Sequence, residues 1–426
     1  MSARAGIIVT GTEVLSGRVA DANGPWVSRR LSELGVDVAH IVCVGDRAED
    51  LTSALRFLAT GGVDLIITTG GLGPTADDIT ADLVAEFAGR EMVLDEEMER
   101  RIDAIVAEFA KRMKFDPEAL REGTRKQAMV PRGSIALDPA GTAPGLVVEA
   151  DGPIVVVLPG PPRELQAMWP AAIASAPFAR VLERADTYAT AAMKMFGIPE
   201  STLAKSLREI EADGVDLSRL EITTCLRKGA ELEIDVRYTV DAEPLREALF
   251  AGLRERHAPV IYTESGESID ALVAELLRGH RVATGESCTA GKLAARLTDV
   301  PGASDYVAGG VVAYSNAAKI ELLGVPAELI ERRGAVSPEV AAALATGAIE
   351  RFAADFGVGI TGIAGPDGGS EEKPVGYVCF CVAAADGRMM ARDVKLPGSR
   401  EDVRERSVSV AMHMLRRFLL NEEAPL

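Results

Sequence analysis

The stretch Asp64-Leu-Ile-Ile-Thr-Thr69, followed directly by Gly70-Gly-Leu-Gly-Pro-Thr-Ala-Asp-Asp78, decides the expected fold. A near-continuous apolar run that ends in a glycine-rich segment is typical of a strand buried on both faces. Ile154-Val-Val-Val-Leu158 has the same character, and amphipathic helical patterns such as Pro25–Gly35 lie between these runs. Strands that alternate with helices predict an α/β fold whose parallel sheet is covered on both faces.

Three loops of this first part follow predicted strands and are expected at the carboxyl ends of the sheet. They are Gly11–Gly17, Gly70–Asp78 and Pro159–Glu164. Ligands of open α/β sheets bind beyond those strand ends, so the three loops could converge on one cleft.

The Gly70–Asp78 loop has the composition of a phosphate site. Its backbone amides lead into a helix expected at Ile79, an arrangement that binds anions, and Asp77 and Asp78 offer hard oxygen ligands for a divalent cation. A structural interpretation is as well supported, because aspartates in a first helical turn complement the helix dipole. Gly71–Ala76 formally matches a dinucleotide-binding pattern, but it follows a later strand, so a Rossmann site is not favoured.

Ser287, in the run Gly285-Glu-Ser-Cys-Thr-Ala-Gly291, marks a second candidate site. Arg281–Thr284 predicts a strand and Thr289–Thr298 a helix, so Ser287 falls in a turn whose unpaired N–H groups could stabilise an oxyanion. A serine hydroxyl needs a neighbouring base, which Lys319 could supply if burial depressed its pKa by ~3 units.

Spacing alone fits a helix-capping serine and a solvated lysine at least as well. The loop Gly362-Ile-Ala-Gly-Pro-Asp-Gly-Gly369, which follows the predicted strand Asp355–Thr361, shifts the balance towards a ligand site. Small residues let a backbone approach a ligand closely, and so glycine-rich a loop is not expected to serve packing alone.

Composition bounds the class of protein. The 64 acidic against 46 basic residues give a net charge of −18, which argues against nonspecific binding of nucleic acid. The five cysteines contain no Cys-x-x-Cys pair, so neither a disulfide framework nor a zinc site is indicated.

No signal peptide and no 18-residue apolar run is found, and we expect a cytoplasmic protein without a membrane anchor. A length of 426 residues predicts several domains, placed at 1–175, 180–260 and 266–426.

Taken together, these runs resemble the competence/damage-inducible protein CinA family over essentially the whole chain. The motifs that carry the resemblance are Thr68–Asp78, Arg125–Ala128, Gly141–Gly145, Leu158–Glu164, Glu286–Thr289, Tyr314–Asn316 and Gly362–Gly369.

The resemblance implies a bifunctional hydrolase of pyridine-nucleotide salvage. Its N-terminal domain would be similar to molybdopterin-binding proteins and would hydrolyse ADP-ribose and related dinucleotides with a divalent metal ion held by Asp77 and Asp78. Its C-terminal domain would be an amidohydrolase without a cofactor, which converts nicotinamide mononucleotide and water into nicotinic acid mononucleotide and ammonia.

The resemblance also implies roles for individual residues. Ser287 would be the nucleophile, Lys319 its base, Tyr314 and Thr361 would assist proton transfer or orient the substrate, and Arg400 would hold the nucleotide phosphate. Further substrate-binding residues are implied at Glu286, Cys288, Thr289, Asn316, Gly362 and Gly365 in the C-terminal domain, and at Gly70, Gly71, Gly73, Thr75, Lys126, Gly160 and Glu164 in the N-terminal domain.

Two features depart from the family pattern. Ala290 stands where many relatives have glycine, a change that should keep the turn unless the position needs a positive φ. The middle segment resembles a KH-like fold, but it lacks the Gly-x-x-Gly loop that clamps RNA. We interpret this segment as a spacer or a dimerisation module, and a homodimer is expected.

Two alternatives stay open at this point. Cys288 could be the nucleophile, with His280 or His413 as its base, although a small buried packing role for this thiol is favoured. The N-terminal domain could be a non-catalytic module that binds a pterin or nucleotide, or a scaffold, which would leave the C-terminal domain as the only enzyme.

Overall fold

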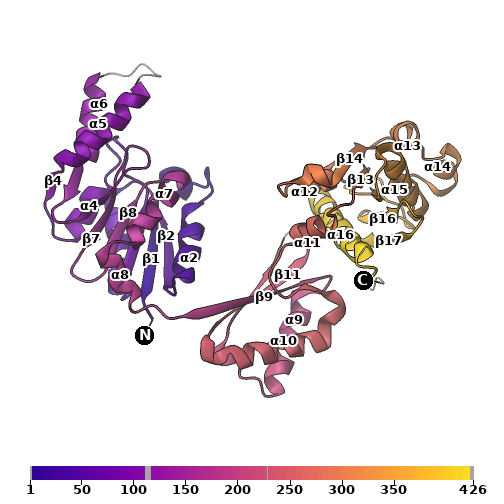
Figure 1. The fold of residues 1–426 in the computed structure, drawn as a ribbon, viewed down its shortest axis with the longest axis horizontal. Coiled ribbons are helices and arrows are strands. Elements are labelled where there is room, and N and C mark those ends of the chain that lie inside the picture. Colours follow the sequence, from indigo (N-terminus) through magenta and orange to yellow (C-terminus); the bar gives the residue numbers. More distant parts are fainter. Residues whose placement is uncertain (1, 111–116, 228, 423–426) are drawn as a thin grey trace. The chain divides into compact units, whose positions relative to one another are not determined.

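The computed structural model describes residues 2–110, 117–227 and 229–422 (Figure 1). Its contacts divide the chain into two compact units, Met1–Tyr188 and Ala189–Leu426. The second unit contains both the predicted middle domain (180–260) and the predicted third domain (266–426), because these two parts share buried contacts.

The first unit is built on a six-stranded sheet of order β2-β1-β3-β8-β7-β6. The first four strands are parallel, whereas β7 and β6 run antiparallel to their neighbours. The elements are β1 (Arg4–Thr10), α1 (Thr12–Leu15), α2 (Asn23–Glu33), β2 (Asp37–Val44), α3 (Ala48–Thr60), β3 (Leu65–Thr69), α4 (Thr80–Phe87), β4 (Met92–Leu94), α5 (Glu96–Ala110), α6 (Pro117–Gln127), β5 (Met129–Pro131), β6 (Ile135–Leu137), β7 (Gly145–Glu149), β8 (Ile154–Leu158), α7 (Pro162–Ile173) and α8 (Ala176–Leu182).

The α/β class predicted from the sequence is confirmed, but the sheet is mixed rather than wholly parallel. The reason lies in the connection between β7 and β8, in which Glu149 pairs with Ile154. So short a link can join only antiparallel neighbours, since a parallel crossover needs a dozen residues or more. Helices cover both faces: α2, α7 and α8 pack on one and α3 and α4 on the other.

The first unit extends past the predicted boundary at residue 175. Helix α7 continues through Pro170, and Pro177 lies in the first turn of α8, where proline is tolerated. Trp169 and Phe178 meet edge to face at 5.8 Å between ring centroids, and both are buried in the core of this unit. The two prolines therefore shape a helical pair instead of ending the domain.

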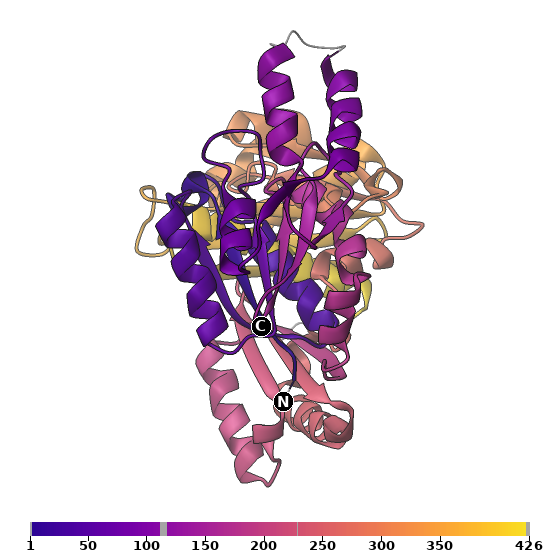
Figure 2. The same cartoon turned by 90° about the vertical axis from the view of Figure 1, so that its left-hand side faces the viewer.

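Helices α5 and α6 form a hairpin that projects from the first unit, as Figures 1 and 2 show. The base of the hairpin packs on a small cluster formed by Met98, Ile102 and Ala128. Lys126 and Gln127, at the end of α6, lie beside the Gly70–Asp78 loop.

The second unit begins with a four-stranded sheet of order β10-β11-β9-β12, whose core residues pack against α9 and α10. The elements of this part are β9 (Tyr188–Phe196), α9 (Glu200–Ala212), β10 (Glu221–Leu226), β11 (Glu231–Thr239), α10 (Glu243–His257) and β12 (Ile261–Thr263).

The rest of the second unit has a five-stranded sheet of order β14-β13-β15-β16-β17. Strands β14, β13 and β15 are parallel, and β16 and β17 complete the sheet antiparallel. The elements are α11 (Ile269–Leu276), β13 (Val282–Glu286), α12 (Lys292–Thr298), β14 (Val307–Val312), α13 (Asn316–Leu323), α14 (Ala327–Arg333), α15 (Pro338–Phe352), β15 (Phe356–Gly362), β16 (Tyr377–Ala384), β17 (Met389–Lys395) and α16 (Arg400–Leu419).

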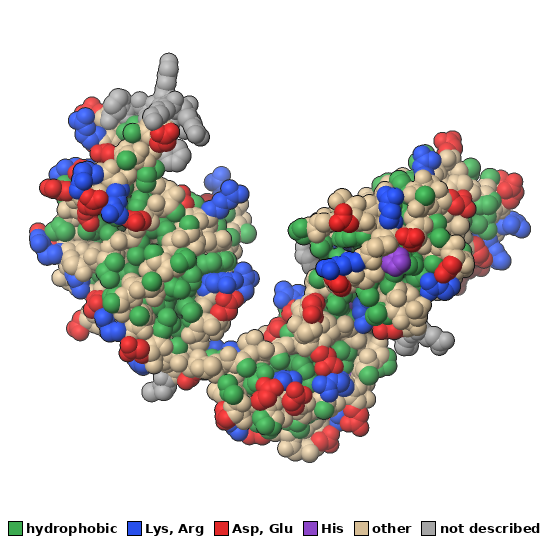
Figure 3. Space-filling view, viewed as in Figure 1, with side chains coloured by type: hydrophobic (Ala, Val, Ile, Leu, Met, Phe, Trp, Pro, Cys, Tyr) green, Lys and Arg blue, Asp and Glu red, His purple; other side chains and the backbone are tan. Residues whose placement is uncertain are grey.

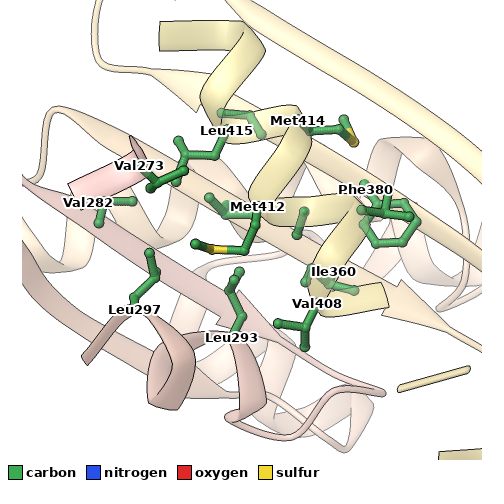
Figure 4. Packing of buried hydrophobic residues seen from close by; sticks show 14 of the residues in the cluster. Val273, Val282, Leu293, Leu297, Ile360, Phe380, Val408, Met412, Met414 and Leu415 are labelled. Atoms are coloured by element: carbon green, nitrogen blue, oxygen red, sulfur yellow. The ribbon is translucent and has the colours of Figure 1, made fainter. Parts of the chain in front are cut away.

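Helix α16 packs on one face of this sheet together with α11 and α12. Figure 4 shows Met412 and Leu415 of α16 facing Val273, Val282 and Leu293 across the cluster. Helix α15 covers the opposite face. With both faces buried, the loops at the carboxyl ends of the parallel strands are left to form a site.

Polar groups join the middle part of the second unit to the rest. Glu231, the first residue of β11, accepts hydrogen bonds from Arg296 at 3.1 Å and Tyr262 at 3.2 Å, and its carboxylate lies 3.7 Å from His413 Nε2. Phe196 stacks on the His413 ring with 3.9 Å between centroids. This buried network fixes β11 against α12 and α16.

Acidic and basic side chains are interspersed on the face drawn in Figure 3, and hydrophobic side chains gather on part of the first unit. Over the described ranges, no helix is both long and apolar enough to cross a membrane.

Candidate functional sites

Three predicted site residues of the second unit lie at the carboxyl ends of adjacent parallel strands. Ser287 follows β13, Tyr314 follows β14, and Thr361 is the penultimate residue of β15. The register holds them together, because Ser287 N–H donates to Ile360 O at 2.9 Å and Ala313 N–H donates to Glu286 O at 2.7 Å. The turn that carries Ser287 is therefore flanked by the ends of both neighbouring strands.

The Glu286 carboxylate organises this turn. It is buried, and it accepts hydrogen bonds from the N–H groups of Gly291, Leu293 and Ala294 at 2.9–3.0 Å and from the Thr284 hydroxyl at 3.2 Å. The helix predicted to begin at Thr289 begins instead at Lys292, because Ala290 and Gly291 have φ of 51° and 88°. The N-terminal amides of α12 thus bind Glu286 instead of pointing outward as predicted.

Two other amides in the turn stay available. The N–H groups of Cys288 and Thr289 donate to no other described residue, and the fully buried Thr289 hydroxyl likewise has no partner among the described residues. Arg404 of α16 holds the same segment from its carbonyl side, donating to Cys288 O and Thr289 O at 3.0 Å each. The two amides lie directly after Ser287, where an oxyanion of a serine-bound tetrahedral group would form.

Lys319 is a buried amine without a carboxylate partner. Its side chain is 2% exposed, and its Nζ donates to Tyr314 O at 3.4 Å. No ion pair to this amine occurs within the described part of the chain. Burial lowers the pKa of Lys319, against a smaller opposing effect of a Cys288 thiolate. The contact with Tyr314 O puts the amine at the carboxyl end of β14, next to the strand that precedes Ser287, and Ser287 and Lys319 share no hydrogen bond.

Arg400, the first residue of α16, brings two further predicted residues together. Its guanidinium donates to Tyr314 Oη and to Gly365 O, both at 2.7 Å. Arg400 and Tyr314 are both exposed, so the remaining guanidinium N–H groups face solvent at the edge of the site.

Three other predicted site residues, Thr361, Gly362 and Asn316, lie at or shortly after the ends of β14 and β15. The Thr361 hydroxyl is buried and donates to Ala335 O at 2.7 Å. Gly362 ends β15, and Asn316 begins α13, where it is exposed.

The alternative nucleophile Cys288 lies in the same turn, but burial raises its pKa to about 12, so its thiol is protonated at neutral pH. Neither proposed base is placed to help it. His280 lies near Asp355 at the amino end of β13, and a five-residue strand of roughly 16 Å separates it from the Ser287 turn. His413 lies between Phe196 and Tyr262.

In the first unit, Thr75, Asp77 and Asp78 form a compact acidic turn. The Thr75 hydroxyl lies 2.5 Å from both Asp77 Oδ1 and Asp78 Oδ2, and Thr75 N–H donates to Asp78 Oδ2 at 2.9 Å. The Thr75 hydrogen bond holds the pKa of Asp77 below its usual range. Lys126 donates to Thr75 O from the end of α6. These contacts hold both carboxylates against the loop.

The remaining predicted residues of this unit border the same loop. A cavity of about 70 Å³ is lined by Gly71, Gly73, Asp78 and Lys126 among others. Gly70 has a φ of 105° and lies against Gly160 of the loop that follows β8, so two of the three predicted loops do meet. Glu164 packs against Gly141, and burial raises the pKa of its carboxyl group.

The donor set of this turn suits a hard divalent cation. In the described part of the chain, no group of three or more His, Cys, Asp or Glu residues gathers to hold a metal ion. Mg²⁺ is typically bound by one or two carboxylates, and water and phosphate supply the other ligands. Asp77 and Asp78 therefore fit such an ion.

Comparisons with known proteins agree with both halves of this architecture. A family model of the CinA C-terminal domain matches residues 266–419, and one of a probable molybdopterin binding domain matches residues 6–178. A CinA-like protein of Mycobacterium sp. (strain MCS) is 58% identical over 420 residues, which cover 98% of this chain and 99% of the relative. The chain belongs to the CinA family. A CinA-like protein of Mycobacterium tuberculosis (strain ATCC 25177 / H37Ra) is 56% identical over 423 residues, 98% of either chain.

Solved structures of the CinA family match shorter parts of this chain. The competence/damage inducible protein CihA from Agrobacterium tumefaciens is 39% identical, with a TM-score of 0.34, and covers 36% of this chain and 96% of its own. The protein CinA from Thermoplasma acidophilum is 31% identical, with a TM-score of 0.34, and covers 40% of this chain and 95% of its own.

Sequence reasoning missed Arg404 at the site of the CinA C-terminal domain, and it gave Glu286 a substrate-binding role but not the role of holding the start of α12. Arg404 reaches the Ser287 turn from a helix more than a hundred residues later, and no local pattern signals that contact. The buried role of Glu286 as a cap of α12 had a weak signal, a carboxylate five residues before Gly291, where the new helix could begin.

Replacing Ala290 by glycine should stabilise the second unit. Ala290 has a φ of 51°, and the left-handed region is strained for a side chain with a Cβ, so the substitution should raise the free energy of unfolding by about 0.5–1 kcal/mol. Urea unfolding measures the change. The matched control is Ala295→Gly in α12, which should destabilise by about 1 kcal/mol. A destabilising Ala290→Gly would contradict the strain argument.

Proposed function

We propose that the second unit is a serine amidohydrolase that deamidates nicotinamide mononucleotide to nicotinic acid mononucleotide. The observation that carries this proposal is the burial of Lys319, whose amine has no carboxylate partner among the described residues and donates to Tyr314 O at 3.4 Å, at the end of the strand next to the one that precedes Ser287. A desolvated amine can be neutral near physiological pH and can then accept the proton of a serine hydroxyl. Family membership supports an enzymatic role, and the motifs favour this nucleotide amide as the substrate.

In the first half of the proposed reaction, Ser287 Oγ attacks the carboxamide carbon and its proton passes to Lys319 Nζ. The carbonyl oxygen gains negative charge, which the N–H groups of Cys288 and Thr289 stabilise. When the C–N bond breaks, the lysine ammonium returns its proton to the leaving nitrogen, which departs as ammonia. The nicotinoyl group stays attached to Ser287 as an ester.

In the second half, water replaces ammonia. Lys319 accepts a proton from the water, the resulting hydroxide adds to the ester carbonyl, and the proton is returned to Ser287 Oγ as the C–O bond breaks. The sum is one amide and one water converted into one acid and ammonia, and the protein is unchanged. We assign the nucleotide phosphate to Arg400, and this is supported by an exposed guanidinium that uses only part of its N–H groups for Tyr314 Oη and Gly365 O.

We further propose that the first unit hydrolyses ADP-ribose. The Thr75–Asp78 turn supports this assignment, since it combines glycine-rich backbone, two carboxylates and Lys126. A divalent cation held by Asp77 and Asp78 would neutralise the diphosphate. Lys126 could pair with the other phosphate oxygens if it left Thr75 O. The competing possibility is that this unit only binds a pterin or nucleotide.

Replacing Ser287 by alanine should lower ammonia release from nicotinamide mononucleotide by roughly 10³-fold or more, because the covalent step loses its nucleophile. Cys288→Ala in the same turn should retain most of the activity, since the Cys288 thiol is protonated and buried. An enzyme-coupled ammonia assay measures both variants. Loss of activity in Cys288→Ala with retention in Ser287→Ala would overturn the assignment.

Replacing Lys319 by methionine should abolish deamidation and yet stabilise the second unit. In the unsubstituted protein, burial lowers the pKa of Lys319, so folding below pH 10.5 must neutralise or desolvate an amine that is charged in the unfolded chain. Removing that cost should raise the free energy of unfolding at pH 7 by about 1–4 kcal/mol, an advantage that shrinks as the pH approaches 10.5.

The deamidation rate itself should rise with pH through the lowered pKa of Lys319 and reach a plateau below pH 10.5. Lys319→Arg should be inactive at every pH, because a guanidinium stays protonated. Chemical unfolding and pH–rate profiles test these points, and a Lys319→Met protein that is both active and less stable would refute them.

Replacing Asp78 by asparagine should lower metal-dependent cleavage of ADP-ribose by roughly 10²-fold or more while leaving deamidation intact. The matched control is Asp103→Asn, an exposed position on α5 outside the loop. Mass spectrometry of the products, AMP and ribose phosphate, provides the readout. If the unsubstituted protein with added metal ion forms neither product, the first unit is a binding module.

A further inference from the structure

Asn23, the first residue of α2, is a buried amide at the base of the loops in the first unit. Its side chain belongs to a residue that is 7% exposed, and its Nδ2 donates to Thr69 Oγ1 and to Gly160 O, both at 2.7 Å. Thr69 ends β3 directly before Gly70, and Gly160 lies in the loop after β8. Asn23 therefore ties together the two loops that border the candidate site. The sequence patterns did not single it out.

The orientation of this amide is set by its neighbours. Gly160 O can only accept a hydrogen bond, and the Thr69 hydroxyl donates its proton to Pro159 O at 3.1 Å, which leaves its oxygen as an acceptor. A flipped amide would set Oδ1 against two acceptors. The carbonyl oxygen of Asn23 is therefore directed away from both, and it is buried with no hydrogen-bond partner among the described residues.

The free carbonyl is not needed to begin the helix. Asp21 Oδ1 accepts the N–H groups of Asn23 and Gly24 at 2.9 Å each, so the first turn of α2 is capped from outside the Asn23 side chain. A buried acceptor without a donor is destabilising, and such groups in folded proteins call for a donor that arrives from elsewhere. An amide cannot relieve this by rotating a hydrogen, as the unpartnered threonine hydroxyls can.

We propose that Asn23 Oδ1 accepts a hydrogen bond from a hydroxyl or amino group of the nucleotide bound by the first unit. This inference rests on the proposed ADP-ribose hydrolysis. The partner must be a donor, and an ionised diphosphate offers none, so the group belongs to a ribose or to the adenine ring. Asn23 then distinguishes substrates by their donors, whereas the Thr75–Asp78 turn binds the charge that all diphosphates share.

The test compares Asn23→Leu with the unsubstituted full-length protein on ADP-ribose and on analogues that each lack one donor, the adenine amino group or one ribose hydroxyl. Leucine has a similar size but no hydrogen-bonding group. We expect kcat/KM for ADP-ribose to fall about tenfold, the usual range for one neutral hydrogen bond. Against one analogue the loss should vanish, because the deleted donor can no longer reach Oδ1.

Thr69→Val is the matched control, since it removes one of the two acceptors of Nδ2 but keeps Gly160 O and the Asn23 carbonyl. It should lower kcat/KM for all substrates by one common factor. A uniform loss in Asn23→Leu would mean that Asn23 only tethers the loops or binds only water, and no loss would also overturn the inference. Thermal unfolding of Asn23→Leu, with Asn23→Ser as a second variant, shows whether the substituted protein is folded. Failure of the unsubstituted protein to cleave ADP-ribose would refute the proposed function and not this inference.

Discussion

Burial of the Lys319 amine is the physical constraint on which the second site depends. A charged ammonium group buried without a counterion is costly, so the folded chain favours the neutral form, and the pKa falls. A carboxylate within ion-pairing distance would remove this effect and restore the charge. Side chains that could ionise near this amine must therefore be neutral or occupied elsewhere. Cys288 meets that condition as a protonated thiol, and Glu286 directs its carboxylate to the amides of α12.

The position of the Ser287 turn rests on contacts from distant parts of the chain. Glu286 binds the turn from one side and Arg404 from the other, and Lys292 pairs with Glu405, which joins α12 to α16. Arg296 extends this connection to Asp270 at 2.6 Å and to Glu231 of the middle part.

The charge state of that junction follows from burial and hydrogen bonding. Burial lowers the pKa of His413 and keeps its ring neutral. Burial alone would raise the pKa of Glu231, but its interactions with His413 at 3.7 Å and with Arg296, which donates a hydrogen bond at 3.1 Å, outweigh burial and lower that pKa. A neutral histidine beside an ionised glutamate leaves Arg296 as the cation of the network. Through Glu231, the middle part of the second unit contacts both α12 and α16, the two helices that hold the Ser287 turn.

Sequence patterns can predict helix starts and loops that depend on interactions between residues close together in the chain. Helices α15 and α11 begin at Ser337 and Ser268, whose hydroxyl groups accept hydrogen bonds from nearby amides, and such caps can be recognised in the sequence. The glycine-rich loop after β3 was likewise evident from composition. The delayed start of α12 could not be predicted, because it depends on the backbone angles at Ala290 and on a carboxylate folding back.

Contacts between distant residues lie beyond such patterns. Arg404, Asn23 and the burial of Lys319 each depend on which strands become neighbours, and periodicity does not encode that order. The sequence also predicted a domain end at residue 175, whereas the first unit continues through α8, because Trp169 of α7 and Phe178 of α8 pack together in its core.

The two candidate sites have opposite electrostatic requirements, and this explains why each is built in its own unit. In the proposed chemistry Asp77 and Asp78 hold a cation, and the hydrogen bond from Thr75 lowers the pKa of Asp77 and so favours its carboxylate form. Lys319 must lose its charge, which requires burial and the absence of nearby carboxylates. A shared cleft would let the aspartates raise the pKa of the lysine, and a bound cation would repel a protonated amine. Separate sheets, each with its own loops at the carboxyl ends of parallel strands, let both conditions hold in one chain.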